Sequence, residues 1–207
     1  MEGRKNVQEL LESNFQVETV YTTDSSFGQN SELIGEKEME RISHLKNASS
    51  YLALGRIPQD VSFDYSKKAI FLDRINDPGN LGAVIRIADW FGFDQVVCSP
   101  NSVDCYNSKV IMASMGSAFR VPVIYDVLEN VIGKSDFETA AAVFDGTSLY
   151  EFKNDNPVNV LMGSEAHGIE ETLVSKCTHK LTIPKVGKAE SLNLSVSCGI
   201  ICSHLST

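Results

Sequence analysis

Three short segments of the 207-residue chain combine polar side chains and glycines in patterns that could do chemistry. Residues 77–82 read DPGNLG, residues 163–168 read GSEAHG, and residues 183–193 read IPKVGKAESLN. The first two directly follow apolar runs of the kind that form buried strands. Ligands of open parallel sheets bind at the carboxyl ends of the strands. We therefore expect the three segments to build one site.

The first segment carries a candidate capping residue and leads to an arginine. Asn80 can cap a helix by accepting a backbone hydrogen bond, and the glycines around it allow close backbone approach. Arg86 follows nearly two turns later among apolar neighbours. An unpaired buried guanidinium is costly, so Arg86 is expected to reach a partner. A capped helix whose arginine extends to solvent is the alternative.

The second segment places a carboxylate between two glycines. Gly163 and Gly168 bracket Glu165, which suits a ligand that touches main-chain atoms while the acid holds one of its polar groups. The segment matches neither GxGxxG nor a P-loop. His167 is either a general base or a loop histidine that faces solvent.

The third segment is expected to end in a helix. The alternation SLNLSVS over residues 191–197 also fits a strand, but the apolar run that follows it favours a broadly buried helix. Leu192 and Leu194 then lie on different sides of that helix. Ser191 and Asn193 come from its first turns, where free backbone N–H groups can meet a ligand.

The elements that must position these segments alternate between short apolar strands and helices. This alternation predicts an α/β fold with a parallel sheet covered by helices on both faces. Before it, helix and strand patterns predict a small α/β domain, so the domains are 1–60 and 63–207. Strands are expected over 17–23, 69–75, 95–99, 122–126, 140–146, 158–163 and 179–184, and helices over 6–13, 36–45, 83–92, 107–119 and 168–177.

Composition excludes several classes of protein. The net charge of −9 argues against a broad, nonspecific nucleic-acid surface but leaves room for a local basic cleft. No apolar run approaches the roughly 18 residues that span a bilayer, and the charged N-terminus is unlike a secretory signal, so we expect a cytoplasmic protein. Five cysteines without a CxxC pair and four scattered histidines indicate neither a disulfide framework nor a metal site. The cysteines are expected to be small core residues.

Taken together, residues 80–86 (NLGAVIR), 162–169 (MGSEAHGI) and 183–200 (IPKVGKAESLNLSVSCGI) resemble the three ordered motifs of the SpoU/TrmH family. Residues 112–123 are similar to the segment that links them, and the resemblance covers about 63–205. Members are S-adenosylmethionine-dependent RNA ribose 2′-O-methyltransferases of the SPOUT class. The resemblance implies a C-terminal deep trefoil knot, a homodimer whose active site uses both protomers, and a tRNA or rRNA substrate.

The resemblance also assigns residues. The implied catalytic set is Arg86, Asn80, Glu165, Ser191 and Asn193, and the implied cofactor-binding set is Gly163, Gly168, Ile183, Leu192 and Thr147. Family descriptions sometimes make the arginine the base, but a guanidinium keeps its proton in proteins, which opposes that role. We expect Arg86 to act as an electrostatic clamp on the target phosphate and the forming alkoxide.

Two departures from the family pattern bear on RNA binding. Relatives with an N-terminal RNA-binding domain of ribosomal-protein-like fold begin it with a basic helix and a strand, whereas this chain starts at Met1, so residues 1–60 are expected to be a partial version of that domain. Met112 stands where relatives often carry a basic residue. Two other functions remain open, a noncatalytic RNA-binding or assembly protein and a knotted-class base methyltransferase. The SLN signature and the spacing from Asn80 to Arg86 favour the ribose enzyme.

Overall fold

The computed structural model describes residues 1–28, 30–59 and 61–206. The chain divides into two compact units, Met1–Asp60 and Val61–Thr207. In the described ranges, no helix has the length and apolar character needed to cross a membrane. All ten predicted site residues belong to the second unit.

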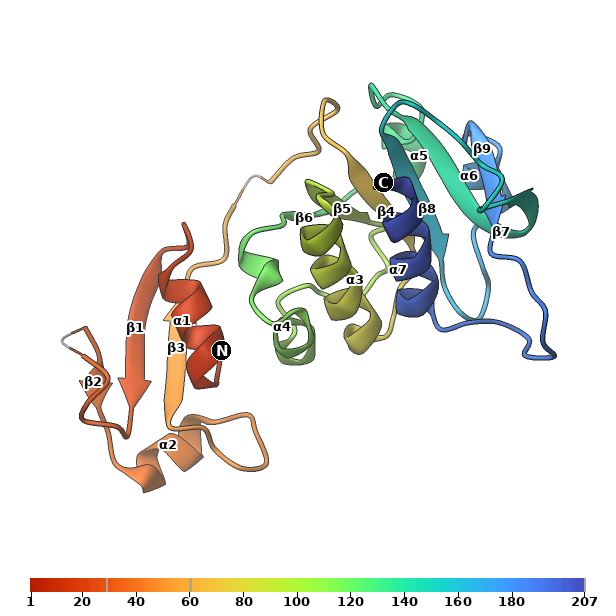
Figure 1. The fold of residues 1–207 in the computed structure, drawn as a ribbon. Helices are drawn as coiled ribbons and strands as arrows, with labels where there is room; N and C mark the ends of the chain where they lie inside the picture. Colours follow the sequence, from red (N-terminus) through yellow and green to blue (C-terminus); the bar gives the residue numbers. More distant parts are fainter. Residues whose placement is uncertain (29, 60, 207) are drawn as a thin grey trace. The chain divides into compact units, whose positions relative to one another are not determined.

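The first unit is a three-stranded sheet with two helices (Figure 1). The strand order is β2-β1-β3, in which β1 pairs antiparallel with β3 and parallel with β2. Val7 and Leu10 are buried on one face of the first helix, as its apolar spacing requires. Strands β2 and β3 were not among the strands that the sequence predicted. The elements are α1 (Arg4–Leu11), β1 (Val17–Thr22), β2 (Glu32–Leu33), α2 (Glu36–Ile42) and β3 (Tyr51–Gly55).

The second unit contains a six-stranded sheet in which every pairing is parallel, so the predicted parallel α/β fold is confirmed. The strands are β4 (Ala69–Asp73), β5 (Gln95–Cys98), β6 (Val123–Tyr125), β7 (Glu138–Ser148), β8 (Val158–Gly163) and β9 (His179–Thr182). Their order is β6-β5-β4-β8-β7-β9. The order reverses between β4 and β8, and ligands bind such sheets at the point of reversal.

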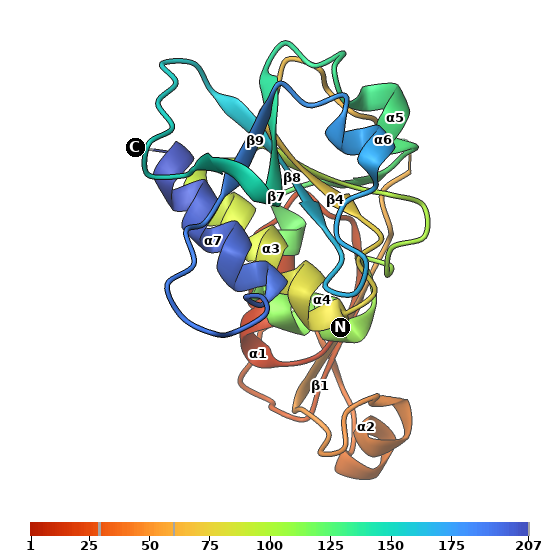
Figure 2. The ribbon, with the colours of Figure 1, turned by 90° about the vertical axis from the view of Figure 1, so that its right-hand side faces the viewer.

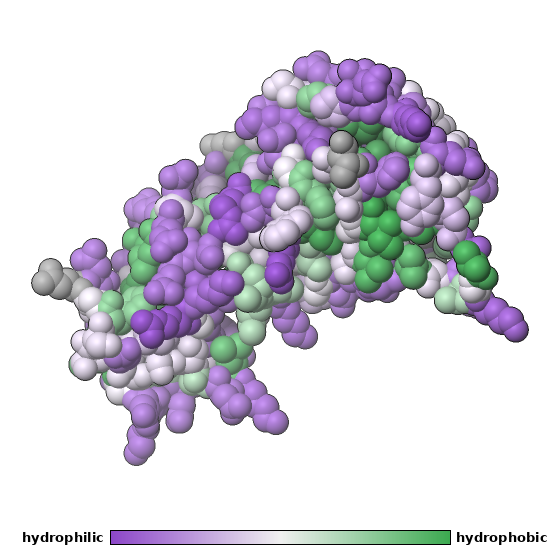
Figure 3. Space-filling model, in the orientation of Figure 1, coloured by the Kyte–Doolittle hydropathy of each residue, from purple (hydrophilic) through white to green (hydrophobic). Residues whose placement is uncertain are grey.

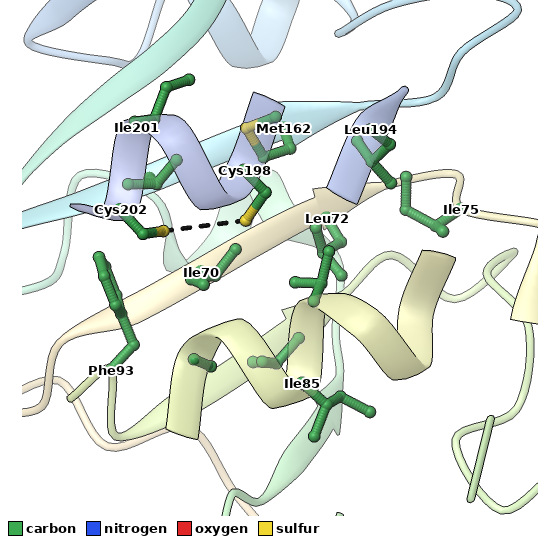
Figure 4. Packing of buried hydrophobic residues seen from close by; sticks show 14 of the residues in the cluster. Ile70, Leu72, Ile75, Ile85, Phe93, Met162, Leu194, Cys198, Ile201 and Cys202 are labelled. Carbon is green, nitrogen blue, oxygen red and sulfur yellow. Dashed lines mark hydrogen bonds between the residues drawn. The ribbon is translucent and has the colours of Figure 1, made fainter. Parts of the chain in front are cut away.

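Helices cover both faces of this sheet, as predicted (Figures 1 and 2). One face carries α3 (Pro78–Phe91), α4 (Ser108–Ser114), a 3₁₀ turn η1 (Ser117–Phe119) and α7 (Leu194–Leu205), and the other carries α5 (Leu128–Val131) and α6 (Glu171–Val174). Side chains alternate along β4 accordingly. Ile70 and Leu72 pack with α3 and α7 (Figure 4). Phe71, between them, packs with α5 and α6 on the other face.

The cysteines are unpaired, and four of the five are buried while Cys177 is half-buried, so the predicted role as core residues is confirmed for those four. Cys198 and Cys202 are fully buried on α7, with their sulfur atoms 3.8 Å apart (Figure 4). Burial raises the pKa of the Cys105 thiol to about 11 and that of Cys177 to about 12. Such thiols stay protonated at neutral pH and are poor nucleophiles.

Helix α3 begins earlier than predicted, and its capping residue is different. Asp77 is the N-cap, and its carboxylate accepts the Asn80 backbone N–H at 2.8 Å, so the prediction that Asn80 caps this helix is wrong. Pro78 fits the first turn because its fixed φ suits a helix and no N–H is needed there. The helix ends at Gly92, whose φ of 66° favours glycine. The Asn80 side chain is thereby left for other contacts.

Two predicted helices are shorter in the structure. The helix expected over 107–119 is interrupted at Met115 and Gly116, which have φ values of 53° and 96°. The helix expected over 168–177 is reduced to the single turn of α6. Where α3 meets α4, a Cβ on Gly82 would lie 2.5 Å from the Ala113 Cβ, so only glycine permits this approach.

Candidate active site

Three polar side chains from the three sequence segments meet beside the point where the strand order reverses. Glu165 follows β8, Asn80 lies in the first turn of α3, and Asn193 precedes α7. Asn80 Nδ2 donates to Glu165 Oε1 at 3.1 Å, and Asn193 Nδ2 donates to Glu165 Oε1 and to Asn80 Oδ1 at 2.9 Å each. The Leu194 backbone N–H also donates to Glu165 Oε1, at 3.2 Å. The structure thus brings together residues that are up to 113 positions apart.

Asn193 is held in orientation from both ends of its amide. Its Oδ1 accepts the Ser195 N–H at 2.9 Å and the Ser195 hydroxyl at 2.6 Å, so it is the N-cap of α7. With the oxygen engaged there, Nδ2 must face Glu165 and Asn80. Helix α7 therefore starts at Leu194, and Ser191 lies before it rather than in its first turn as predicted.

The glycines around Glu165 are required by the loop itself. A Cβ on Gly163 would lie 2.2 Å from the Gly168 carbonyl carbon, and Gly168 has a φ of 64°. The loop closes when the Gly168 N–H donates to the Ser164 carbonyl at 2.9 Å. His167 is exposed and contacts this loop through its backbone N–H, which donates to Ser164 Oγ. The bracketing glycines thus fix the path that presents Glu165.

A further residue that positions this loop was not predicted. Asp73, the last residue of β4, is only 3% exposed, and its carboxylate accepts the Glu170 backbone N–H at 3.1 Å. Both of its oxygens also accept from Arg74, whose φ of 56° is unusual for a residue other than glycine. An aspartate at the end of an otherwise apolar strand was the available signal. Asp73 joins β4 to the loop that carries Glu165.

A cavity of about 360 Å³ opens beside this cluster. Among its lining residues are six that the sequence predicted for the site: Gly163, Glu165, Gly168, Ile183, Ser191 and Leu192. Strand β7 contributes Phe144, which is 82% exposed and was not predicted. Thr147 is exposed and pairs with Leu181 of β9 instead of lining the cavity. Apolar walls with a few polar groups are typical of small-molecule sites.

The exposure of Arg86 agrees with the predicted alternative, whereas that of α7 contradicts the prediction. Arg86 is exposed, so its side chain extends to solvent, and in the described ranges its guanidinium has no recorded hydrogen bond or ion pair. Helix α7 is not buried broadly, because Val196 is 49% exposed, and Leu192 just before it is 47% exposed. Only the face with Leu194 and Cys198 is buried. No group of three possible metal ligands was found in the described ranges.

The parallel sheet, the cavity at its carboxyl edge and the polar cluster at the reversal of strand order define an α/β protein that binds a small ligand. Residues 67–203 match the SpoU rRNA Methylase family. The chain therefore belongs to this family of RNA methyltransferases.

Individual relatives agree with the family assignment. The chain is 28% identical to the 23S rRNA (guanosine(2553)-2′-O)-methyltransferase RlmP of Bacillus subtilis, over 99% of this chain and 87% of that protein. A TrmH-family structure from Porphyromonas gingivalis is 30% identical, covers 99% of this chain and 88% of its own, and has a TM-score of 0.88. An AdoMet-bound rRNA methyltransferase from Sinorhizobium meliloti is 25% identical over 99% of this chain and 85% of its own, with a TM-score of 0.85.

Replacing Asn193 tests the cluster through the pH dependence of stability. Asn193→Asp keeps an oxygen for the cap but places a second carboxylate where Nδ2 now lies 2.9 Å from Glu165 Oε1. Because two such carboxylates resist joint ionisation, the pKa of one rises above its unfolded value of about 4. Below about pH 4 the free energy of unfolding of this variant therefore matches that of wild type. As the pH rises through the raised pKa, the variant loses stability relative to wild type.

Urea unfolding between about pH 4 and about pH 8, followed by far-ultraviolet circular dichroism, measures this effect. Asn193→Ser is the uncharged control, and we expect it to lower the free energy of unfolding by about 1 kcal/mol at every pH. A pH-independent difference between Asn193→Asp and wild type would contradict the cluster.

Proposed function

We propose that this protein transfers a methyl group from S-adenosylmethionine to a ribose 2′-hydroxyl of tRNA or rRNA. The observation that carries the proposal is the hydrogen-bonded cluster of Asn80, Glu165 and Asn193 at the rim of the cavity. Each residue comes from a different one of the three family motifs. The names of the relatives support the same chemistry, since RlmP is a ribose 2′-O-methyltransferase and the Sinorhizobium enzyme binds AdoMet.

The residues around the cavity fit S-adenosylmethionine. Its volume of about 360 Å³ lies in the range of small-molecule sites. Ile183 and Leu192 supply apolar wall, and the backbone around Gly163 and Gly168 supplies polar groups without side chains in the way. When bound, the cofactor supplies a methyl group activated by a sulfonium cation. We further propose that Thr147 lies near the adenosine, because Phe144 of the same strand, β7, lines the cavity.

The protein's own residues must make the ribose 2′-hydroxyl reactive as a nucleophile. A ribose hydroxyl is nearly neutral at pH 7, so it has to be positioned, and its developing negative charge has to be stabilised. Glu165, Asn80 and Asn193 organise the rim, where Ser191 presents a further hydroxyl. Arg86 binds the target phosphate and the forming alkoxide, and the proton leaves through phosphate or water.

Arg86 acts in the cavity of a second copy of the chain. It lies six residues after Asn80 on α3, which moves it about 9 Å along the axis and about 120° around it. Asn80 faces Glu165 of its own chain, whereas Arg86 is exposed and is not among the residues that line the cavity. A guanidinium directed away from its own site fits a homodimer in which each subunit completes the other.

The outer face formed by α3 and α7 is suited to that dimer. Trp90, one turn beyond Arg86, is 80% exposed, and Val196 on α7 is 49% exposed. The two helices are in contact, and a Cβ on Gly199 would lie 3.7 Å from Ile87. Figure 3 shows apolar surface in the region where Figure 1 draws α7. Burial of such a patch against a second copy is favourable.

Three further proposals concern the path of the chain, the role of the first unit and the location of the enzyme. Strand β9 lies at the edge of the sheet, beside β7. The next element, α7, packs against α3 and against β8, which lies in the middle of the sheet. We propose that residues 183–193 make this return through a deep trefoil knot, and an electron-density map tracing them outside the preceding loops would contradict it. We propose that residues 1–60 are an RNA-binding domain and that the enzyme works in the cytoplasm. If replacing Arg4 and Lys5 with glutamate leaves the affinity for RNA unchanged, the proposed RNA-binding role of the first unit is contradicted.

Arg86→Ala is expected to lower methyl transfer at least about 100-fold, because it removes the charge that stabilises the alkoxide. S-adenosylmethionine affinity, measured by calorimetry, is expected to stay within a few-fold of wild type. Total RNA and labelled cofactor provide the assay, and resistance of the modified nucleotide to alkaline cleavage distinguishes ribose from base methylation. Lys134→Ala, at another exposed cation, is the control. Equal loss of cofactor affinity and turnover would oppose this role for Arg86.

Val196→Glu is expected to give a monomer without methyl transfer, since it places a charge in the proposed interface while leaving the core untouched. Sedimentation equilibrium should show about twice the 22.7 kDa chain mass for wild type and a single chain for the variant. Val127→Glu, an exposed valine on the other face of the sheet, is the matched control. A fully active monomer would refute the shared site.

A further inference from the structure

The exposed side of α3 carries a negative charge close to the proposed RNA-binding arginine. Asp89 lies three residues after Arg86 on this continuous helix. Residues three apart on a helix are neighbours, so an arginine and an aspartate at this spacing can form an ion pair. Arg–carboxylate pairs are among the stronger side-chain contacts. A pair between Arg86 and Asp89 would therefore cancel the charge that the proposed function needs.

Asp89 instead binds a different arginine. Arg120 Nε and Nη2 lie 3.0 Å and 2.8 Å from the same oxygen, Asp89 Oδ2. Arg120 directly follows the 3₁₀ turn η1, which packs against α3, and its Nη2 lies 3.5 Å from Ser117 Oγ. Both side chains remain partly exposed, at 47% for Arg120 and 28% for Asp89. The carboxylate is thus held to the flank of α3 that faces η1.

The other arginines of the second unit underline the contrast. The sequence of this unit contains three arginines. Arg74 is bound by Asp73 and Arg120 by Asp89. In the described ranges, Arg86 is the remaining one, with no carboxylate recorded against it.

We propose that Arg120 is a positioning residue that keeps Asp89 away from Arg86, so that the Arg86 guanidinium stays available for RNA. This inference rests on the proposed function of Arg86. It requires no contact between Arg120 and the substrate. An RNA phosphate that approached Arg86 would otherwise compete with a carboxylate on the same turn and be repelled by it.

Arg120→Ala is expected to release Asp89 toward Arg86. Methyl transfer should fall about tenfold, and the salt dependence of RNA binding without cofactor should weaken by about 0.7 in the slope of log K against log salt, the value for one phosphate contact on single-stranded RNA. Asp89→Asn in the same chain should restore both, because a neutral amide does not neutralise Arg86. Asp89→Asn alone should behave as wild type.

Thermal unfolding of wild type, the two single variants and the double variant shows whether each is folded. If a variant with Arg120→Ala is unfolded, Arg120→Gln and Arg120→Gln/Asp89→Asn are used instead. Wild-type transfer in Arg120→Ala, or a defect that persists in Arg120→Ala/Asp89→Asn, would overturn the proposal. Arg86→Ala in the same assay separates the two ideas. If it keeps full activity, the proposed function of Arg86 fails; if it is inactive while Asp89→Asn does not rescue, only the role of Arg120 fails.

Discussion

The site depends on one oxygen atom. Glu165 Oε1 accepts N–H groups from Asn80, Asn193 and the backbone of Leu194. A carboxylate has no proton to donate when ionised, so it can serve only as the common acceptor for these donors. Its position at the start of α7 also places negative charge where the helix has unpaired backbone N–H groups. The Glu165 side chain thereby fixes the positions of α3, the loop after β8 and α7 relative to one another.

The oxygen can act in this way only because the loop that carries Glu165 is itself constrained. Gly163 and Gly168 lie too close for any side chain at Gly163, and Asp73 anchors the far end of the loop through the Glu170 N–H. Constraints of this kind leave little freedom to be lost when a ligand binds, which is the physical value of a preformed site. The apolar wall of the cavity is less constrained by such contacts, because residues such as Phe144 lie largely in solvent.

The sequence could predict the parallel sheet and the meeting of Asn80, Glu165 and Asn193, because strand and helix patterns place all three at one edge. It could not predict which residue caps α3. Asp77 and Asn80 are both good caps, and the choice depends on where Pro78 starts the helix. Nor could periodicity reveal that Val196 is half exposed, because an apolar residue reads the same whether its partner is the core or a second chain.

The charges of the second unit show why composition is a weak guide to RNA binding here. A net charge of −9 opposes broad attraction to phosphate, so recognition has to depend on where individual cations lie. Ion pairing removes two of the three arginines of this unit from that role, because Asp73 and Asp89 each hold one. The acidic residues therefore do more than lower the net charge. By holding Arg74 and Arg120, they leave Arg86 as the arginine of this unit with no carboxylate recorded against it in the described ranges, and this is the charge that the proposed function assigns to an RNA phosphate.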